Sequence, residues 1–243
     1  MLKRRIDIGE YEGDIRKLLE RRLSQTTVDF SVMPYETGMV VELRAADALD
    51  DLCKALALLL CRDLCHFELA QLTDKLPLSL VEKQAVLAHS VYCARRVERM
   101  GKVKRGLKTY LENTEALHLS GYMRFRMSDT MNLWRLCVQS AMEELQLEKE
   151  YFELMGVLHA FVEAKPTRVR EVSLLLNPDG SCTLTDDSDA RIDYRECDPD
   201  RLVSVLVDLA PERLTVYDFG KEANGLLIEM LRRVFADRVR VID

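Results

Sequence analysis

The sequence predicts an α+β fold, mainly α, in which a helical body carries a small N-terminal βαββ piece and a C-terminal α/β module. Apolar residues recur at helical spacing through residues 47–165, which indicates the helical body. After Pro166 the apolar period changes to two, or to short apolar runs, and this change indicates strands. We therefore expect three regions, at residues 1–46, 47–165 and 166–243.

The first region is predicted to be a βαββ piece that depends on the helices after it. Its helix is expected at 14–23, where Ile15, Leu19 and Leu23 lie on one side. The expected strands are 4–8, 28–32 and 39–43, with a hairpin loop at 34–38. A piece of this size buries too little apolar surface to be stable alone.

The region 47–164 is expected to be helical throughout, in roughly four segments. In the first segment Leu52, Leu56 and Leu60 share one stripe and further leucines surround it, which predicts burial on most sides. Pro77 interrupts the pattern. Ser79 and Glu82 have the spacing of a capping box, and they predict the start of the next helix.

One long helix is expected from Ser128 to Ala164, because no glycine occurs before Gly156 and no proline before Pro166. Two apolar rows follow it at helical spacing. The first row is Leu133, Leu136, Ser140, Leu147, Tyr151, Leu154, Leu158 and Phe161, and the second is Met127, Met131, Trp134, Val138, Ala141, Leu145, Phe152, Met155 and Val162. A helix with one buried face needs one row, so two rows predict partners on both sides.

The C-terminal module is predicted to contain a hairpin and a βαβ crossover. Strands at 172–176 and 182–185 flank Asn177-Pro178-Asp179-Gly180, a strong turn signal, and a short third strand is expected at 192–194. Asp198 and Pro199 have the positions of a cap and a first helical residue for a helix at 198–209. The segments 214–217, 224–235 and 239–242 have the spacing of a parallel strand pair joined by a helix. We expect residues 167–243 to form one sheet that packs on the end of the long helix.

Composition and charge favour a cytoplasmic protein without a membrane span. The richest apolar run, Ala55–Cys61, is too short to cross a bilayer, and acidic residues follow Lys3-Arg4-Arg5 where a signal peptide needs an apolar core. The net charge of −6 is uneven, with +1 in residues 1–120 and −7 in 121–243, so the acidic half is a poor nucleic-acid surface. The seven cysteines are irregularly spaced and are expected to be reduced.

The segment Gly121-Tyr122-Met123-Arg124-Phe125-Arg126-Met127, the long helix with Glu148-Lys149-Glu150-Tyr151, and the order of elements after it resemble the YtxC-like family of proposed sporulation proteins. The similarity covers about residues 110–243. It implies a role in endospore-forming bacteria, but it identifies no catalytic or binding residues.

One basic cluster is a candidate nucleic-acid interface. Seven cations fall within fourteen residues: Arg95, Arg96, Arg99, Lys102, Lys104, Arg105 and Lys108. Such a row could neutralise successive phosphates of a nucleic-acid backbone. The alternative is a solvated helix face whose charges balance the acidic half, since no helix-turn-helix or RNA-binding signature accompanies the cluster.

Two Cys/His pairs form the second candidate site. Cys61 and Cys65, and likewise His89 and Cys93, are four residues apart and therefore share one side of a helix. In an antiparallel helix hairpin centred near Pro77 the four side chains lie level, as tetrahedral zinc requires. However, Cys61 lies on the flank of the main apolar stripe of the first helix, and Cys65 lies farther round. A site that faces the second helix would therefore require this stripe to turn partly away from its nearest neighbour. We therefore expect reduced cysteines without metal or other cofactor, with zinc as the alternative.

The sequence contains no recognisable reaction centre. Its glycines are too few and too scattered for a dinucleotide or phosphate loop, and it has no serine nucleophile elbow. The leading interpretation is a non-enzymatic cytoplasmic protein-interaction protein with an unidentified protein partner, and the resemblance adds sporulation. The alternatives are a nucleic-acid-binding protein that uses the basic helix 95–108, and an enzyme whose site is not recognised.

Overall fold

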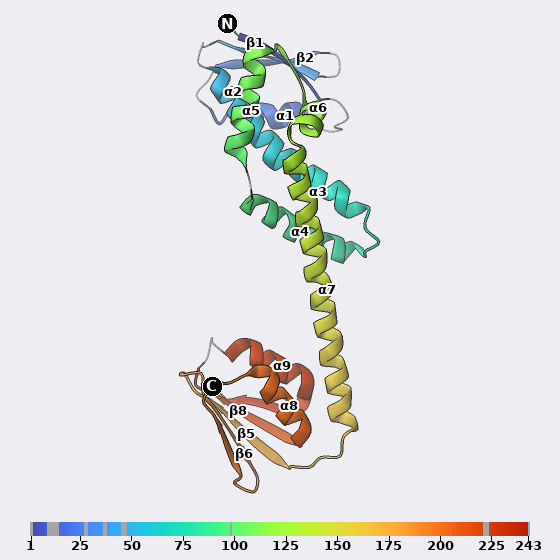
Figure 1. Ribbon diagram of the computed structural model, residues 1–243, viewed down its shortest axis with the longest axis vertical. Coiled ribbons are helices and arrows are strands. Elements are labelled where there is room, and N and C mark those ends of the chain that lie inside the picture. Colours follow the sequence, from blue (N-terminus) through green and yellow to red (C-terminus); the bar gives the residue numbers. More distant parts are fainter. Residues whose placement is uncertain are drawn as a thin grey trace. The chain divides into compact units, whose positions relative to one another are not determined.

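The computed structural model describes residues 2–8, 15–26, 29–35, 38–44, 48–97, 99–220 and 224–242 (Figure 1). Of the described residues 62% are helical, and the strands among them form two small mixed sheets, which confirms the predicted α+β, mainly α, fold class. It divides into two compact units, Met1–Gln146 (unit 1) and Leu147–Asp243 (unit 2). Val28 and Asp47, at which a strand and the helical body were expected to begin, lie outside the described residues.

Unit 1 contains a four-stranded mixed sheet in the order β2-β3-β1-β4. Its strands are β1 (Leu2–Asp7), β2 (Phe30–Tyr35), β3 (Gly38–Leu43) and β4 (Ala116–His118). Strand β3 pairs antiparallel with β1 and β2, and helix α1 (Ile15–Leu23) precedes β2 in the chain. The predicted order of elements in the βαββ piece is therefore confirmed.

Both strands extend into the hairpin loop expected at 34–38, and Glu36 and Thr37 lie outside the described residues. Strand β2 continues through Pro34 and Tyr35, and β3 begins at Gly38. Proline is tolerated there because β2 is an edge strand, where a missing N–H need not break a ladder bond. Gly38 is required by the close approach of β1, since an added Cβ would collide with the carbonyl oxygen of Ile6.

The prediction that residues 47–164 are entirely helical is wrong at β4. Ala116–His118 pair in parallel with Arg5–Asp7 of β1, and Leu117 is buried opposite Ile6. Three residues are too few to show a strand period, and their partner strand lies more than a hundred residues away in the sequence. The strand is therefore a consequence of tertiary packing, which local periodicity does not report.

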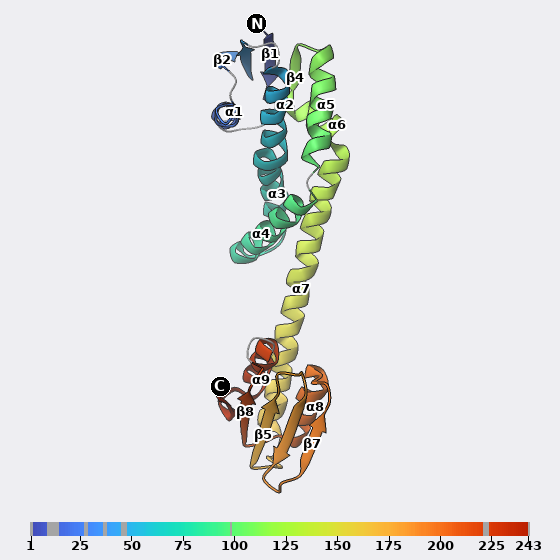
Figure 2. The ribbon, with the colours of Figure 1, turned by 90° about the vertical axis from the view of Figure 1, so that its left-hand side faces the viewer.

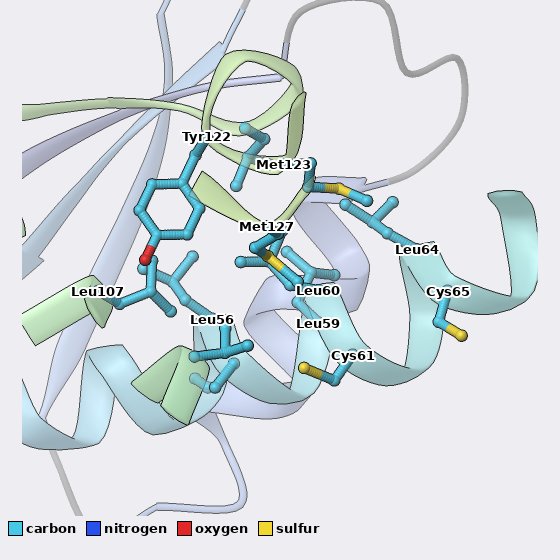
Figure 3. Packing of buried hydrophobic residues seen from close by; sticks show 14 of the residues in the cluster. Leu56, Leu59, Leu60, Cys61, Leu64, Cys65, Leu107, Tyr122, Met123 and Met127 are labelled. Carbon is cyan, nitrogen blue, oxygen red and sulfur yellow. The ribbon is translucent and has the colours of Figure 1, made fainter. Parts of the chain in front are cut away.

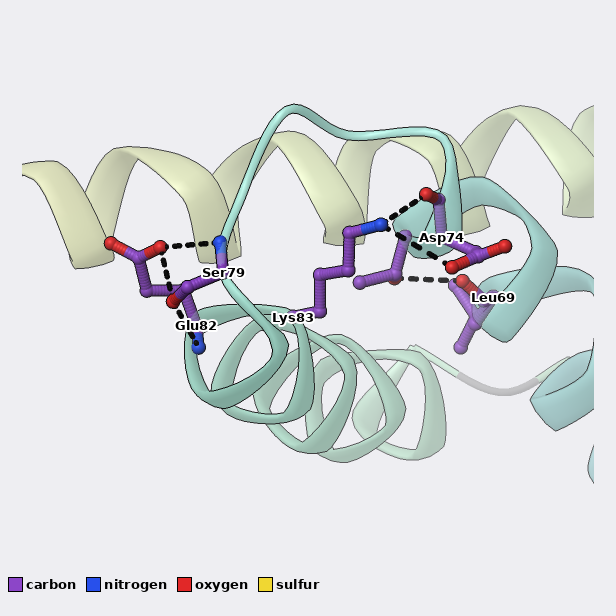
Figure 4. Close-up of polar contacts among 6 residues, drawn as sticks. Leu69, Asp74, Ser79, Glu82 and Lys83 are labelled. Atoms are coloured by element: carbon purple, nitrogen blue, oxygen red, sulfur yellow. Dashed lines mark hydrogen bonds and ion pairs between the residues drawn. The ribbon is translucent and has the colours of Figure 1, made fainter.

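The remaining elements of unit 1 are helical. They are α2 (Ala48–Leu58), η1 (Leu59–Leu64), α3 (Cys65–Asp74), α4 (Leu80–Arg96), α5 (Met100–Asn113), α6 (Leu119–Arg126) and the first part of α7 (Ser128–Ala164). The capping box is confirmed (Figure 4): Ser79 N donates to Glu82 Oε2 at 2.7 Å, and Glu82 N donates to Ser79 Oγ at 3.4 Å. In the same turn Lys83 Nζ donates to the carbonyl oxygen of Asp74, which ties α4 to the end of α3.

Helices α2, η1 and α3 follow one another directly, and the middle piece is a π-helix that the sequence pattern does not predict. Burial of α2 on most sides is confirmed, since the consecutive residues Ala55, Leu56 and Ala57 are all fully buried. Arg22 of α1 holds η1 through two hydrogen bonds to Asp63, Nε to Oδ2 at 2.9 Å and Nη2 to Oδ1 at 2.7 Å. A bidentate pair of this kind also fixes orientation.

Helix α7 confirms the prediction of one long helix from Ser128 to Ala164, but much of its first apolar row is exposed. Most of the second row is buried: Met127, Trp134, Val138, Ala141, Met155 and Val162. Four residues of the first row are more than half exposed: Leu136, Leu147, Leu154 and Phe161. The predicted burial on both sides is therefore wrong at these positions, because the core in each unit covers one side of the helix.

Unit 2 contains a five-stranded mixed sheet in the order β7-β6-β5-β8-β9. Its strands are β5 (Glu171–Leu176), β6 (Cys182–Asp186), β7 (Arg191–Tyr194), β8 (Arg213–Asp218) and β9 (Val239–Ile242). The hairpin β5–β6 and the parallel pair β8–β9 are both confirmed. Gly180 in the hairpin turn has φ +81°, the left-handed conformation that a glycine adopts without strain.

Helices α8 (Pro199–Leu209), α9 (Gly225–Phe235) and the end of α7 lie on the same side of this sheet (Figure 2). The short 3-10 turn η3 (Ala236–Arg238) joins α9 to β9. Asp198 caps α8 as predicted, with its side chain accepting a hydrogen bond from Asp200 N at 3.2 Å. Met155 and Val162 of α7 belong to one buried cluster with the strands and with helices α8 and α9, so the C-terminal module as a whole packs on the end of the long helix.

Candidate functional site

The basic cluster is distributed over two helices of unit 1. Arg95 and Arg96 end α4, Arg99 precedes α5, and the other four cations lie on α5. Two of those four pair with a single carboxylate of α2: Lys104 Nζ lies 2.6 Å from Asp50 Oδ2, and Lys108 Nζ lies 3.6 Å from Asp50 Oδ1. The hydrogen bond from Lys104 is the main cause that lowers the pKa of Asp50 below its usual value. These two lysines are therefore engaged within the fold.

Among the described residues, the other five cations of the cluster do not pair with α2. Lys102 Nζ lies 3.4 Å from Asp129 Oδ2 at the start of α7, and the Arg96 guanidinium lies 5.7 Å from the centre of the Tyr92 ring. The side chains of Arg95, Arg99 and Arg105 are exposed, and they have no hydrogen-bond or ion-pair partner in the part of the chain that the structure describes. The seven residues thus do not form one continuous row, and the nucleic-acid interface stays a prediction.

The Cys/His candidates also separate in the structure. Cys61 and Cys65 are buried in η1 and α3 (Figure 3), whereas His89 of α4 is directed to α7, with Nε2 3.0 Å from Glu144 Oε2. Cys93 is half-buried. Among the described residues, no three or more His, Cys, Asp or Glu side chains are grouped as metal ligands are, these four included. The expectation that these residues bind no metal stays a prediction, which elemental analysis of the purified protein tests.

A line of exposed apolar side chains follows α7 in unit 2. We call it the α7 stripe: Leu147, Leu154, Val157 and Phe161, each more than half exposed. Leu147, Leu154 and Phe161 are seven residues apart, about two helical turns, so they lie on one side of the helix. The small exposed residues Ala160 and Ala164 lie beside them on the helix. The surface beside the stripe is therefore open.

The surroundings of the α7 stripe are acidic. Glu150 and Glu153 are exposed on the same helix, next to the stripe. Residues 147–243 contain 13 Lys and Arg against 20 Asp and Glu, a net charge of −7. One cation lies at the end of the stripe: Lys165 Nζ is 5.2 Å from the centre of the Phe161 ring and 3.3 Å from Asp208 Oδ1. The ammonium group of Lys165 is therefore already paired within unit 2.

A groove in unit 1 was not identified from the sequence. It has a volume of about 690 Å³ and lies between α5 and the junction of α6 with α7; we call it the α5–α6 groove. The residues that matter here are Lys102, Arg105, Gly106, Tyr122, Arg126 and Asp129. Two features of the sequence lie at this place: Gly106, a glycine within the helical region, and the segment 121–127 that resembles the family. Neither feature alone indicates a cavity.

The comparisons with known proteins identify one family. The model of the YtxC-like family matches residues 68–240, which is most of the chain. No curated protein and no solved structure gives a match. The matched range begins in α3 and includes α6, all of α7 and the sheet of unit 2 as far as β9. The chain belongs to the YtxC-like family.

Proposed function

We propose that this protein is a non-enzymatic protein-interaction protein that acts in sporulation, and that it binds its partner through the α7 stripe. The observation that carries the proposal is the exposure of four large apolar side chains on one side of a helix whose other side is packed. Contiguous exposed apolar surface of this kind is typical of interaction sites. Membership of the YtxC-like family supports the sporulation context, through the resemblance described above.

The chemistry around the stripe indicates the kind of partner. Leu154 and Phe161 offer the regularly spaced apolar anchors that a second amphipathic helix uses. The small side chains of Ala160 and Ala164 leave room for the partner backbone to approach closely. Since Glu150 and the rest of unit 2 are acidic, charge complementarity favours a partner helix with Lys or Arg beside its apolar face.

Photo-crosslinking in sporulating cells tests this proposal directly. A benzophenone amino acid replaces Val157 in the stripe, and the matched control carries it at Glu148, an exposed position roughly 120° around the helix from Leu154. We expect one discrete adduct from position 157 and none of the same mass from position 148. The adduct should weaken when Glu150 and Glu153 are both changed to Lys, because the charge attraction is reversed.

Three results would count against the stripe as the binding site. They are equal adducts from positions 157 and 148, the absence of an adduct from 157 while the protein is abundant, and a crosslinked partner segment that is acidic. Leu154→Lys provides an independent check, since this residue is more than half exposed and the change should leave the fold intact. Loss of the adduct in that variant, with unchanged circular dichroism, is the expected result.

Nucleic-acid binding is a second candidate function, favoured by the exposed and unpartnered side chains of Arg95, Arg99 and Arg105 within the described part of the chain. The test is binding of the purified protein to mixed DNA and RNA at several salt concentrations. If the cluster binds nucleic acid, changing Arg99, Lys102 and Arg105 to Glu should abolish the binding and its salt dependence. Absence of salt-dependent binding in the unchanged protein would exclude this function.

A further inference from the structure

The α5–α6 groove contains a buried hydroxyl group without a partner. Tyr122 is 7% exposed, and its side chain has no hydrogen-bond partner among the described residues. Figure 3 shows its ring beside Leu107, with the hydroxyl oxygen directed towards α5. Buried hydroxyl groups are nearly always hydrogen-bonded, to protein, to water or to a ligand. An unpaired hydroxyl at the wall of a groove therefore indicates a place where a polar group can bind.

The position of this hydroxyl depends on a glycine. A Cβ at Gly106 would lie 2.9 Å from Tyr122 Oη, closer than real Cβ contacts, so any other residue would displace the phenol. The Tyr122 ring is also held by an edge-to-face contact with Tyr110, with ring centres 5.6 Å apart and an interplanar angle of 74°. Burial raises the pKa of Tyr122 to about 12, so at neutral pH the hydroxyl keeps its proton and can donate it.

The lining of the groove carries an excess of positive charge. Lys102, Arg105 and Arg126 line it, against the single carboxylate of Asp129. Asp129 already pairs with Lys102 at 3.4 Å. Within the described residues this leaves the guanidinium groups of Arg105 and Arg126 without an acidic partner. Arg126 and Tyr122 line the same groove, and the positive charge of Arg126 opposes the rise of the Tyr122 pKa.

The remaining polar groups suit the body of a ligand. Thr109, Asn113 and Thr130 add neutral hydrogen-bonding groups to the lining, and Val103 and Met127 add apolar surface. The volume of about 690 Å³ lies within the range of small-molecule sites. Guanidinium groups bind phosphate oxygens with two parallel hydrogen bonds, and phosphate oxygens accept from a phenol hydroxyl.

We propose that the α5–α6 groove binds a small phosphorylated molecule, with Arg105, Arg126 and the Tyr122 hydroxyl holding its phosphate group. The body of the molecule is a hydrogen-bonding one, such as a sugar or a nucleoside. The site is independent of the α7 stripe, because it lies wholly in unit 1. If the groove does not bind a phosphorylated molecule, the proposed interaction function of the α7 stripe is therefore unaffected.

Isothermal titration calorimetry of the full chain tests the proposal with five probes: inorganic phosphate, a hexose phosphate, AMP, adenosine and a single-stranded DNA 20-mer. We expect the hexose phosphate or AMP to bind, and adenosine to bind at least about tenfold more weakly than AMP, because the phosphate contacts are charge-assisted. Arg105→Gln and Arg126→Gln should each weaken that binding about tenfold or more. Both arginines are exposed, so these variants should keep the fold.

Two further variants separate the groove from general electrostatic attraction. Arg95→Gln removes an unpartnered cation outside the groove. This variant should bind the phosphorylated probe with the same affinity as the unchanged protein. Tyr122→Phe removes only the hydroxyl and should weaken binding by a few-fold while the circular dichroism is unchanged.

Three outcomes overturn the proposal. One is that inorganic phosphate, the hexose phosphate and AMP all fail to bind at millimolar concentration. Another is an equal loss of affinity in Arg95→Gln and in Arg126→Gln. The third is that only the DNA 20-mer binds, with strong salt dependence, which would assign these cations to nucleic acid instead.

Discussion

Replacing Val138 by alanine should destabilise unit 1, whereas replacing Leu136 by alanine should not. The two residues are two positions apart on α7, but Val138 is 8% exposed and Leu136 is 57% exposed. Val→Ala removes two buried carbons, about 1.6 kcal/mol of transfer free energy at about 0.8 kcal/mol each. The cavity left behind raises the expected loss to about 2 kcal/mol. Leu→Ala at the exposed position should change stability by less than about 0.5 kcal/mol.

Urea unfolding followed by tryptophan fluorescence measures both changes. Trp134 is the only tryptophan in the sequence and is buried in unit 1, so its emission follows unit 1 however unit 2 unfolds. With a urea dependence of about 2 kcal/mol per molar, Val138→Ala should lower the midpoint by about 1 M, and Leu136→Ala by less than about 0.3 M. Equal shifts, or a larger shift for Leu136→Ala, would refute the burial of α7 on one side.

Three further predictions follow from burial. Burial raises the pKa of Tyr122 to about 12 in the folded protein, whereas an ordinary tyrosine in the unfolded chain has a pKa of about 10. The unfolded chain therefore loses the hydroxyl proton at a lower pH than the folded protein, so the free energy of unfolding falls as the pH rises above about 10. The Tyr122→Phe variant should show a smaller drop in urea midpoint between pH 8 and pH 10.5, and an identical drop would contradict this. Burial also raises the pKa of the Cys53 thiol to about 11. In the folded protein iodoacetamide should therefore modify Cys53 more slowly than the half-buried Cys93, as measured by mass spectrometry. Equal rates of modification would count against the buried position of Cys53. A fragment of residues 147–243 should melt at a higher temperature than one of 167–243, because only the first contains the part of α7 that completes the core of unit 2; calorimetry that finds the two equally stable would show that this helix is dispensable.

The features that the sequence predicted correctly are those set by neighbouring residues. The capping box needs only Ser79 and Glu82, three positions apart, and it forms as expected. The turn at Gly180 and the cap at Asp198 likewise depend on a few adjacent residues. The long helix follows from the lack of glycine and proline over most of its length, together with its apolar period. Each of these signals acts within one or two turns of chain.

The candidate sites were predicted less well, because their geometry depends on residues far apart in the sequence. Lys104 is part of a basic run in the sequence, but its partner is Asp50, 54 residues away, and this contact removes it from the exposed cluster. His89 has the spacing to share a site with Cys93, yet it is directed to Glu144 of α7. Spacing along one helix shows which side chains share a face, but it does not show which element that face meets.

The sequence by itself determined the fold class, the order of most elements and the position of helix α7, because apolar period, caps and turn residues act locally. Only the tertiary structure decided which apolar residues of α7 are buried, since both rows have helical spacing. In unit 2 the core takes Tyr151 and Leu158 from the first row beside Met155 and Val162 from the second. It also decided that Ala116–His118 form a strand, because that strand exists only through its pairing with β1. The contact between Gly106 and Tyr122 has the same origin: two helices must meet before a missing Cβ can make room for a phenol hydroxyl.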